Sequence, residues 1–460
     1  MSTILNAELK RSASPQLTAL LYSPDQGIVA RAALAFGRIG DPAGRPALRP
    51  LLRSSNARVR AMAAYGLGLL ADEASLEALS ELARHDPAGA VRYGAVDALG
   101  RILTVERQRV SRSLASAMLA VVNDPNPAVR GHAAANTDVF RSSAYALSIA
   151  DGLGERFVHE ADGDVRWHLM WALFRAFPLQ AGRAVLVAGL HDPDELVRVE
   201  AVRAWAKRAD PDAAALVRPL LADPSWRVQL QAAETLRQLA KEPPTEHLTA
   251  LPPGLHLPPV APRTYPTPGA PTLPPPAAPP SRPSAPALAD LTEAPLYAPA
   301  SALGMNEAAP GLHPRVRIVT TKGALIVRLY PEWAPITVAN FLHLAASNYY
   351  DYNRWFRIVP DFVVQSGDPN DNGEGDAGYT IPAELNPVEQ RSGVIAMGLN
   401  YENNHALRDS AGTQFYITLS PQLHLDRDFT VFGEVSEGFD VLARLVESDR
   451  IFVIRKIADG

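Results

Sequence analysis

Two hydrophobic patterns divide the chain. In the first half, apolar residues recur every three or four positions, as in "VRAMAAYGLG" from Val59 and "VRYGAVDALG" from Val91, which predicts amphipathic helices. From about Pro314 the pattern changes to alternation, in short segments such as "VRIVTTKGALIVRLY" and "TQFYITL" that predict strands. We therefore expect an all-α region followed by a mainly β region.

The helical half repeats itself around an arginine that, apart from the last example, follows a small or branched apolar residue. These arginines are Arg31, Arg60, Arg92, Arg130, Arg166, Arg198 and Arg227. Successive differences of 29, 32, 38, 36, 32 and 29 residues lie in the range of solenoids built from stacked units. Asp-Pro breakers open several units, at Asp86, Asp124, Asp192 and Asp223. Each unit is therefore interpreted as a helix pair.

The repeated arginine has two interpretations. A structural ladder, in which each arginine pairs with an Asp or a carbonyl of the neighbouring repeat, is the favoured one. The alternative is an anion-binding groove. The pattern as a whole resembles the HEAT repeat family, particularly its short bacterial variety, over residues 1–241. The resemblance implies about seven antiparallel helix pairs in a right-handed superhelix, whose concave face binds client or partner proteins.

Proline dominates the segment that follows. Between Pro243 and Pro299 lie 19 of the 41 prolines of the chain. Such a segment buries too little apolar surface to offset its ordering entropy, which predicts a disordered, partly polyproline II linker over residues 242–311. The alternatives are an internal substrate for the second half of the chain and a ligand for a proline-reading partner. Because the linker is long, we expect the two halves to be independent domains.

Composition narrows the classes of function. The formal net charge of -5 argues against a nucleic-acid partner, and no apolar run approaches the roughly 18 residues of a membrane span. The first residues lack the apolar core of a signal peptide, so we expect a cytoplasmic protein; a periplasmic or extracytoplasmic one is the alternative if an upstream signal was removed. The absence of cysteine excludes disulfides, thiolate metal sites and thiol catalysis.

Two motifs suggest cofactors that the sequence around them does not support. "GEGDAG" from Gly373 matches a dinucleotide fingerprint, but its acidic residues would repel a pyrophosphate. "DPNDNG" from Asp368 copies half of an EF-hand loop, yet its twelfth position is Tyr379 and not a bidentate Glu. An Asx-rich turn is the favoured interpretation, with a weak Ca²⁺ site as the alternative. We expect no cofactor and no metal.

Arg357 stands out in "WFRIVPDFVVQSGDP", a run otherwise suited to a buried strand. Burial of a guanidinium costs several kcal/mol unless it is paired or faces a cleft. The order of this run with "TKGALIVRLYPEWAPITVANFLHLAASNYYD", "GVIAMG", "SAGTQFYITLS" and "LHLDRDFTVFGEV" resembles the cyclophilin-type peptidyl-prolyl isomerases. The resemblance implies a closed antiparallel eight-stranded barrel with two capping helices over residues 312–460, and an active site on the outside of the barrel.

The resemblance also assigns roles to residues of this sequence. It implies Arg357 as the catalytic donor and Gln365 as a ligand of the substrate backbone. Seven further positions would bind substrate: Phe362, Val363, Tyr416 and Leu425 as the apolar proline pocket, Gln414 at its rim, and Phe429 and His424 beside it. The chemistry is consistent, because twisting an X-Pro bond pyramidalises the proline nitrogen, which a permanently protonated donor stabilises.

Several positions depart from the common family pattern. Phe429 replaces the pocket histidine, His424 replaces a pocket tryptophan, and Ser366 replaces the first of two glycines. The segment "GLNYENNHALRD" from Gly398 is longer than its usual counterpart. We therefore expect a peptidyl-prolyl isomerase of altered substrate preference that acts on X-Pro-containing polypeptides, with the solenoid recruiting clients. The alternative is a non-catalytic scaffold whose barrel only binds proline-containing segments.

Overall fold

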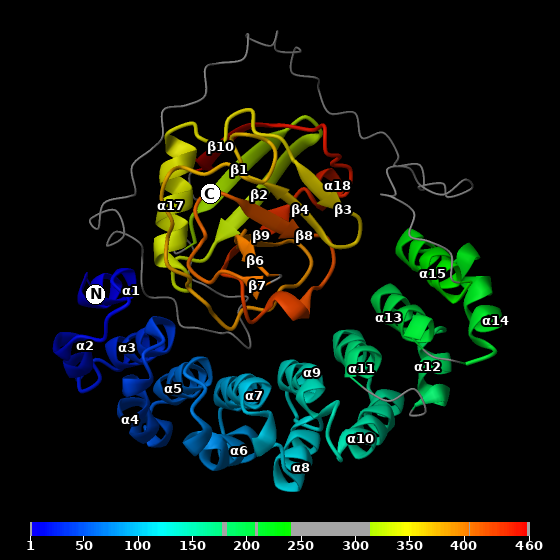
Figure 1. Ribbon diagram of the computed structural model, residues 1–460, viewed down its shortest axis with the longest axis horizontal. Helices are drawn as coiled ribbons and strands as arrows, with labels where there is room; N and C mark the ends of the chain where they lie inside the picture. Colours follow the sequence, from blue (N-terminus) through cyan, green and yellow to red (C-terminus); the bar gives the residue numbers. More distant parts are fainter. Residues whose placement is uncertain (1, 177–181, 208–209, 241–312, 404, 458–460) are drawn as a thin grey trace. The chain divides into compact units, whose positions relative to one another are not determined.

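The computed structural model describes residues 2–176, 182–207, 210–240, 313–403 and 405–457 (Figure 1). The predicted proline-rich linker, residues 242–311, lies outside the described residues. The helices of the first half are α1 (Ser2–Leu9), α2 (Pro15–Leu20), α3 (Gln26–Ile39), α4 (Arg45–Leu48), α5 (Ala57–Leu69), α6 (Leu76–His85), α7 (Gly89–Val105), α8 (Arg112–Val121), α9 (Pro127–Asn136), α10 (Ala146–His159), α11 (Gly163–Ala176), α12 (Arg183–Gly189), α13 (Glu195–Lys207), α14 (Ala213–Val217) and α15 (Trp226–Leu239).

The arginine ladder is confirmed. In α5, Arg60 Nε donates to Asp86 of the next repeat at 2.7 Å, and its Nη1 donates to the carbonyl of Ser54 at 2.8 Å. The same double contact recurs through the repeats: Arg130 with Glu160 and the Asp124 carbonyl, Arg166 with Asp192 and the Glu160 carbonyl, and Arg198 with Asp223 and the Asp192 carbonyl. These four arginines are therefore engaged in contacts within the repeats, as the structural-ladder interpretation predicts, and not in an anion groove.

The Asp-Pro breakers explain the turn between repeats. Asp86 Oδ1 accepts a hydrogen bond from the Ala88 amide at 2.9 Å, which closes an Asx turn before α7. Asp192 and Asp223 do the same with the amides two residues later. One carboxylate thus starts a helix and anchors the arginine of the preceding repeat. Close packing adds to this, since a Cβ at Gly68 would lie 2.7 Å from Cα of Ala98 in α7.

The second half forms one eight-stranded antiparallel sheet with the order β10-β1-β2-β9-β5-β8-β4-β3, and β6 and β7 form a separate two-stranded hairpin. The strands are β1 (Arg315–Thr320), β2 (Gly323–Leu329), β3 (Arg357–Val359), β4 (Val363–Ser366), β5 (Val394–Met397), β6 (Tyr401–Glu402), β7 (His405–Ala406), β8 (Phe415–Thr418), β9 (Val431–Glu437) and β10 (Ile451–Ile457). The fold class predicted from the alternation is confirmed.

The edges of this sheet meet just before β3 and β10. A bridge joins Arg354 to Arg450, and the Trp355 amide donates to the Asp449 carbonyl at 3.0 Å. The contact is a short bridge and not a full ladder. Inside the curled sheet lie side chains such as Ile318, Val364, Phe415 and Phe432, all buried. The helix α17 (Pro335–Ala346) packs its Phe341 into this core, and the other predicted helix is reduced to one turn, α18 (Phe439–Leu442).

The chain forms two compact units whose boundary does not follow the change in pattern. The first unit joins Met1–Leu82 and Asp86–Ile102 to the strand-rich region, and the second holds the helices from α8 onwards. Leu5 of α1 belongs to the same hydrophobic core as the barrel strands. The expectation of fully independent halves is therefore wrong for the first repeats, because they bury surface against the barrel.

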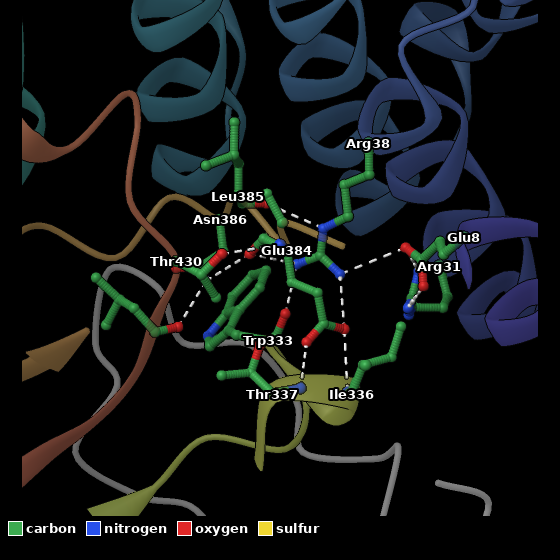
Figure 2. A network of polar contacts seen from close by, with 12 residues as sticks. Glu8, Arg31, Arg38, Trp333, Ile336, Thr337, Glu384, Leu385, Asn386 and Thr430 are labelled. Atoms are coloured by element: carbon green, nitrogen blue, oxygen red, sulfur yellow. Dashed lines mark hydrogen bonds and ion pairs between the residues drawn. The ribbon is translucent and has the colours of Figure 1, made fainter. Parts of the chain in front are cut away.

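A buried polar network holds the first repeats to the barrel (Figure 2). Arg38 of α3 is fully buried, and its Nε donates to the Leu385 carbonyl at 3.0 Å. Its other nitrogens contact Glu8 Oε1 at 3.4 Å and the Trp333 carbonyl. Arg31 pairs with Glu8 through both carboxylate oxygens. Although burial alone would raise it, the charges of Arg31 and Arg38 hold the pKa of Glu8 below its ordinary value.

Glu384 completes this network from the barrel side. It lies 3.9 Å from Arg38, and its carboxylate accepts the Ile336 and Thr337 amides at 3.2 and 2.8 Å. These amides are unsatisfied donors of the first turn of α17, so Glu384 caps that helix. Burial raises the pKa of Glu384. Two carboxylates and two guanidinium groups therefore compensate one another out of solvent, which is the condition under which buried charge is tolerated.

Candidate active site

The candidate site lies on the outer face of the sheet. Along β4, Val364 enters the barrel core, so Val363 and Gln365 point the other way. On β8, Phe415 and Ile417 enter the core, so Tyr416 also points outward, and it is the register partner of Gln365. Alternation thus brings outward side chains of adjacent strands together. Tyr416 is not barrel core, although it is 5% exposed.

Arg357 opens β3 and is exposed, not buried as its apolar surroundings in the sequence suggested. It is the register partner of Gln365, whose Oε1 accepts from Arg357 Nη1 at 3.4 Å. The guanidinium carbon stands 5.5 Å from the centre of the Phe362 ring. Among the described residues these partners are neutral, so the positive charge of Arg357 is not cancelled by a carboxylate at bonding distance.

The side chains of Arg357, Gln365 and Gln414 form a chain of hydrogen bonds that ends in the turn at Asp368. Gln365 Nε2 donates to Gln414 Oε1 at 3.1 Å, and Gln414 Nε2 donates to the Gly373 and Gly375 carbonyls at 2.9 and 3.2 Å. Asp368 shapes that turn by accepting the Asn370 and Asn372 amides at 2.8 and 2.9 Å. The Asx-rich turn is therefore confirmed, and its carbonyls orient Gln414. Within the described residues, no group of three or more potential metal ligands occurs.

Aromatic and aliphatic side chains form the other part of the site. Phe362 stacks on His424, with ring centres 5.8 Å apart and planes 14° apart. Tyr416 meets Phe429 edge to face at 5.6 Å. Leu425 lies between His424 and Phe429 in the chain, and it is buried, as is Val363. We refer to Phe362, Val363, Tyr416, His424, Leu425 and Phe429 as the apolar cluster.

The structure adds residues that motif matching had missed. The Tyr416 hydroxyl donates to Gln390 Oε1 at 2.9 Å, and the Gln390 amide donates to Asp426 Oδ1 at 2.7 Å. Gln390 is fully buried and thereby ties the 389–391 loop to the loop that carries Leu425. Burial raises the pKa of Tyr416, so the phenol stays protonated as the donor. No spacing in the sequence marks Gln390, since its role depends on how its loop meets β8 and the loop that carries Asp426.

The departures from the common pattern have different consequences. Ser366 continues β4, and only Gly367 has a positive φ, of 92°. Replacement of the preceding glycine by serine is therefore unstrained, and the Ser366 hydroxyl donates to the Arg354 carbonyl at 2.8 Å. The longer segment forms the β6–β7 hairpin, whose Tyr401 ring lies 6.5 Å from Phe429 and is 60% exposed. Tyr401 thus extends the edge of the apolar cluster.

Comparison with known proteins agrees with this geometry. The family model described as cyclophilin type peptidyl-prolyl cis-trans isomerase/CLD matches residues 315–453. A peptidyl-prolyl cis-trans isomerase of Synechococcus elongatus is 36% identical over 143 residues, which cover 31% of this chain and 94% of the relative. The chain belongs to the cyclophilin-type isomerase family.

Further relatives of this cyclophilin-type domain come from distant organisms. The peptidyl-prolyl cis-trans isomerase B of Bacillus subtilis is 40% identical over 129 residues, covering 28% of this chain and 86% of the relative. A solved cyclophilin-type isomerase of Cryptosporidium parvum covers 32% of this chain and 99% of that chain, at 26% identity and a TM-score of 0.30. In the helical half, a family model described as HEAT repeats matches residues 14–100, 150–237 and 183–251.

Proposed function

We propose that the cyclophilin-type domain catalyses cis–trans isomerisation of X-Pro bonds in polypeptides, with Arg357 as the transition-state donor. The observation that carries this is the position of Arg357. It is an exposed guanidinium with neutral partners, held by Gln365 and standing over Phe362 at the start of the apolar cluster. A proline ring seated on that cluster would present its nitrogen to the guanidinium.

The chemistry requires neither nucleophile nor base. Twisting the X-Pro amide breaks its resonance, and the barrier of about 18–20 kcal/mol makes the uncatalysed reaction slow. In the twisted state the nitrogen gains a lone pair, which accepts a hydrogen bond that the planar states cannot accept as well. A donor aimed at that nitrogen therefore lowers the barrier by differential binding. Gln365 Nε2 and Gln414 lie beside it as ligands for the substrate backbone.

We further propose that the HEAT repeats recruit client proteins. The HEAT-family match and the continuous ladder support a rigid binding scaffold. Within the first unit, the surfaces of α3 and α7 that carry Arg38 and Tyr93 contact the barrel. Recruitment would therefore rely on the concave face of the later repeats, from α8 onwards.

None of the helices in the described part of the chain combines the length and apolar character that spanning a bilayer requires.

A protease-coupled assay on short X-Pro peptides with the full chain tests the catalytic proposal. Arg357→Ala is expected to lower kcat/KM by on the order of 10² to 10³, the value of one pre-aimed donor. Arg354→Ala is the matched control, because the Arg354 side chain contacts the Glu447 carbonyl, outside the site. Wild-type activity in Arg357→Ala would contradict the mechanism. A wild-type chain that binds such peptides without accelerating isomerisation would favour the non-catalytic scaffold.

A further inference from the structure

Helix α7 carries a buried polar stripe among mainly small and apolar residues. Tyr93, Asp97 and Arg101 follow one another at intervals of four, so they share one face. They are 5%, 5% and 8% exposed. Buried tyrosine, aspartate and arginine on one face of a repeat helix are costly unless a defined partner satisfies them. Two members of this stripe, Tyr93 and Arg101, bond the barrel of the same unit.

Arg101 is held rigidly from its own side. Its Nε donates to Asp97 Oδ2 at 2.6 Å, its Nη2 donates to the Tyr65 hydroxyl at 3.2 Å, and its guanidinium carbon lies 5.1 Å from the centre of the Tyr65 ring. These contacts aim the remaining N–H groups outward from α7. They reach the carbonyls of Arg427 and Asp426 at 3.4 and 3.5 Å.

Those two carbonyls belong to the loop that carries part of the apolar cluster. His424 and Leu425 come just before them and Phe429 just after. The loop has short-range bonds of its own, such as the Phe429 amide to the Leu425 carbonyl at 3.3 Å, and Asp426 Oδ1 accepts the Gln390 amide at 2.7 Å. Arg101 is thus a charged donor that fixes this loop from outside the barrel. Each bond is long, but the donor is buried and has little water to bond instead.

Tyr93 reaches the neighbouring loop in the same way. Its hydroxyl contacts Glu389 Oε1 at 3.0 Å and the Pro387 carbonyl at 3.4 Å. Glu389 directly precedes Gln390, which accepts the Tyr416 hydroxyl and donates to Asp426. One face of α7 therefore contacts both loops that are joined behind the apolar cluster.

We propose that Arg101 and Tyr93 are positioning residues for the apolar cluster, so that the helix pair α6–α7 is part of the isomerase and not only a scaffold. This rests on the proposed function. A substrate pocket binds well only when its walls are held in place by a supporting shell. A loosened wall should weaken binding of the proline ring equally in the planar and twisted states. Such a loss raises KM and leaves kcat nearly unchanged, unlike the loss of Arg357.

The test compares Arg101→Met with Arg11→Met in the full chain. Arg11, between α1 and α2, also contacts the barrel, at Asp409 and the Ala383 carbonyl and not at the 387–390 and 425–429 loops. Arg101→Met is expected to raise KM about fivefold with kcat within about twofold of wild type. Deuterium uptake over residues 422–429 should be faster in Arg101→Met and unchanged in Arg11→Met. Equal KM and equal uptake in the two variants would overturn the proposal.

Tyr93→Phe keeps the test valid if Arg101→Met does not fold. It removes only the hydroxyl, and we expect a KM increase of about twofold and faster uptake over residues 387–391. Wild-type values for both would overturn the role of Tyr93. If the wild-type chain proves inactive, the proposed catalysis fails separately, and uptake together with affinity for an X-Pro peptide still decides whether α7 positions the cluster.

Discussion

Arg38 Nε of α3 donates a 3.0 Å hydrogen bond to the Leu385 carbonyl of the barrel, across 347 positions of sequence. The donor is fully buried and shares its charge between Glu8 of α1 and Glu384 of the barrel. This one guanidinium therefore links the helical repeats to the residue that caps α17. The sequence predicted two domains joined only by a linker, but this buried contact also joins the first repeats to the barrel.

Removal of this guanidinium should destabilise the first unit strongly. Arg38→Met leaves Glu8 and Glu384 with less compensation out of solvent, and we expect a loss of about 3–5 kcal/mol of unfolding free energy. Arg444→Met is the control, because Arg444 pairs with Asp440 on the surface and should contribute about 0.5 kcal/mol or less. Urea unfolding of the two variants checks this. Similar midpoints would mean that the buried network contributes little.

A lysine at position 357 should fail to replace the arginine. The ammonium group cannot bond Gln365 and a substrate nitrogen in the fixed geometry of a guanidinium fork. We expect Arg357→Lys to recover less than about a tenth of wild-type kcat/KM, with an unchanged thermal midpoint because the side chain is exposed. Progress curves with a short X-Pro peptide measure the first quantity. Full activity of the lysine variant would show that charge alone suffices.

Glu332 should give the fold a specific pH dependence. Burial raises its pKa from 4.5 to about 7, while Arg328 and Arg58 act in the opposite direction. The folded state therefore binds more protons than the unfolded state between about pH 4.5 and 7, so this contribution to stability falls as pH rises through that window and levels off above it. His313, 3.5 Å away, has a lowered pKa and contributes the opposite slope.

The contribution of Glu332 is isolated by comparison with Glu332→Gln. The amide keeps the shape of the side chain and cannot ionise. Relative to wild type, the variant should gain up to about 3 kcal/mol of unfolding free energy between pH 4 and pH 8. Urea unfolding at both pH values measures this difference. A difference that does not change with pH would contradict the burial argument.

Removal of residues 1–241 should affect the barrel directly. Glu384 would lose Arg38, and the loop at residues 425–429 would lose Arg101, so both the thermal midpoint and kcat/KM on a short peptide should fall. Independent halves joined by a tether would instead leave peptide turnover unchanged. The comparison of residues 312–460 with the full chain in the peptide assay distinguishes the two. Refolding of a client protein then reports recruitment separately.

The local sequence pattern by itself determined the helix pairs, the arginine ladder and the antiparallel sheet. The spacing of Arg60, Arg130, Arg166 and Arg198 predicted both the helix pairs and the ladder, because each arginine bonds a carboxylate one repeat away and a carbonyl six residues earlier. Alternation in "TQFYITL" and the order of motifs predicted the antiparallel sheet and placed Arg357 with Gln365. These features depend on contacts that recur at fixed distances along the chain.

Tertiary structure alone decided how the parts are combined. The contacts that bury Arg38 and Arg101 join surfaces 347 and 326 positions apart, and the contact of Gln390 with Tyr416 joins two segments 26 positions apart. The exposure of Arg357 likewise depends on where its strand lies in the sheet. In the sequence, a buried arginine and a solvated one are the same letter on a helix, because the cost of removing its charge from water depends on a partner elsewhere in the chain. Periodicity identifies a helix face, but not the surface that will cover it.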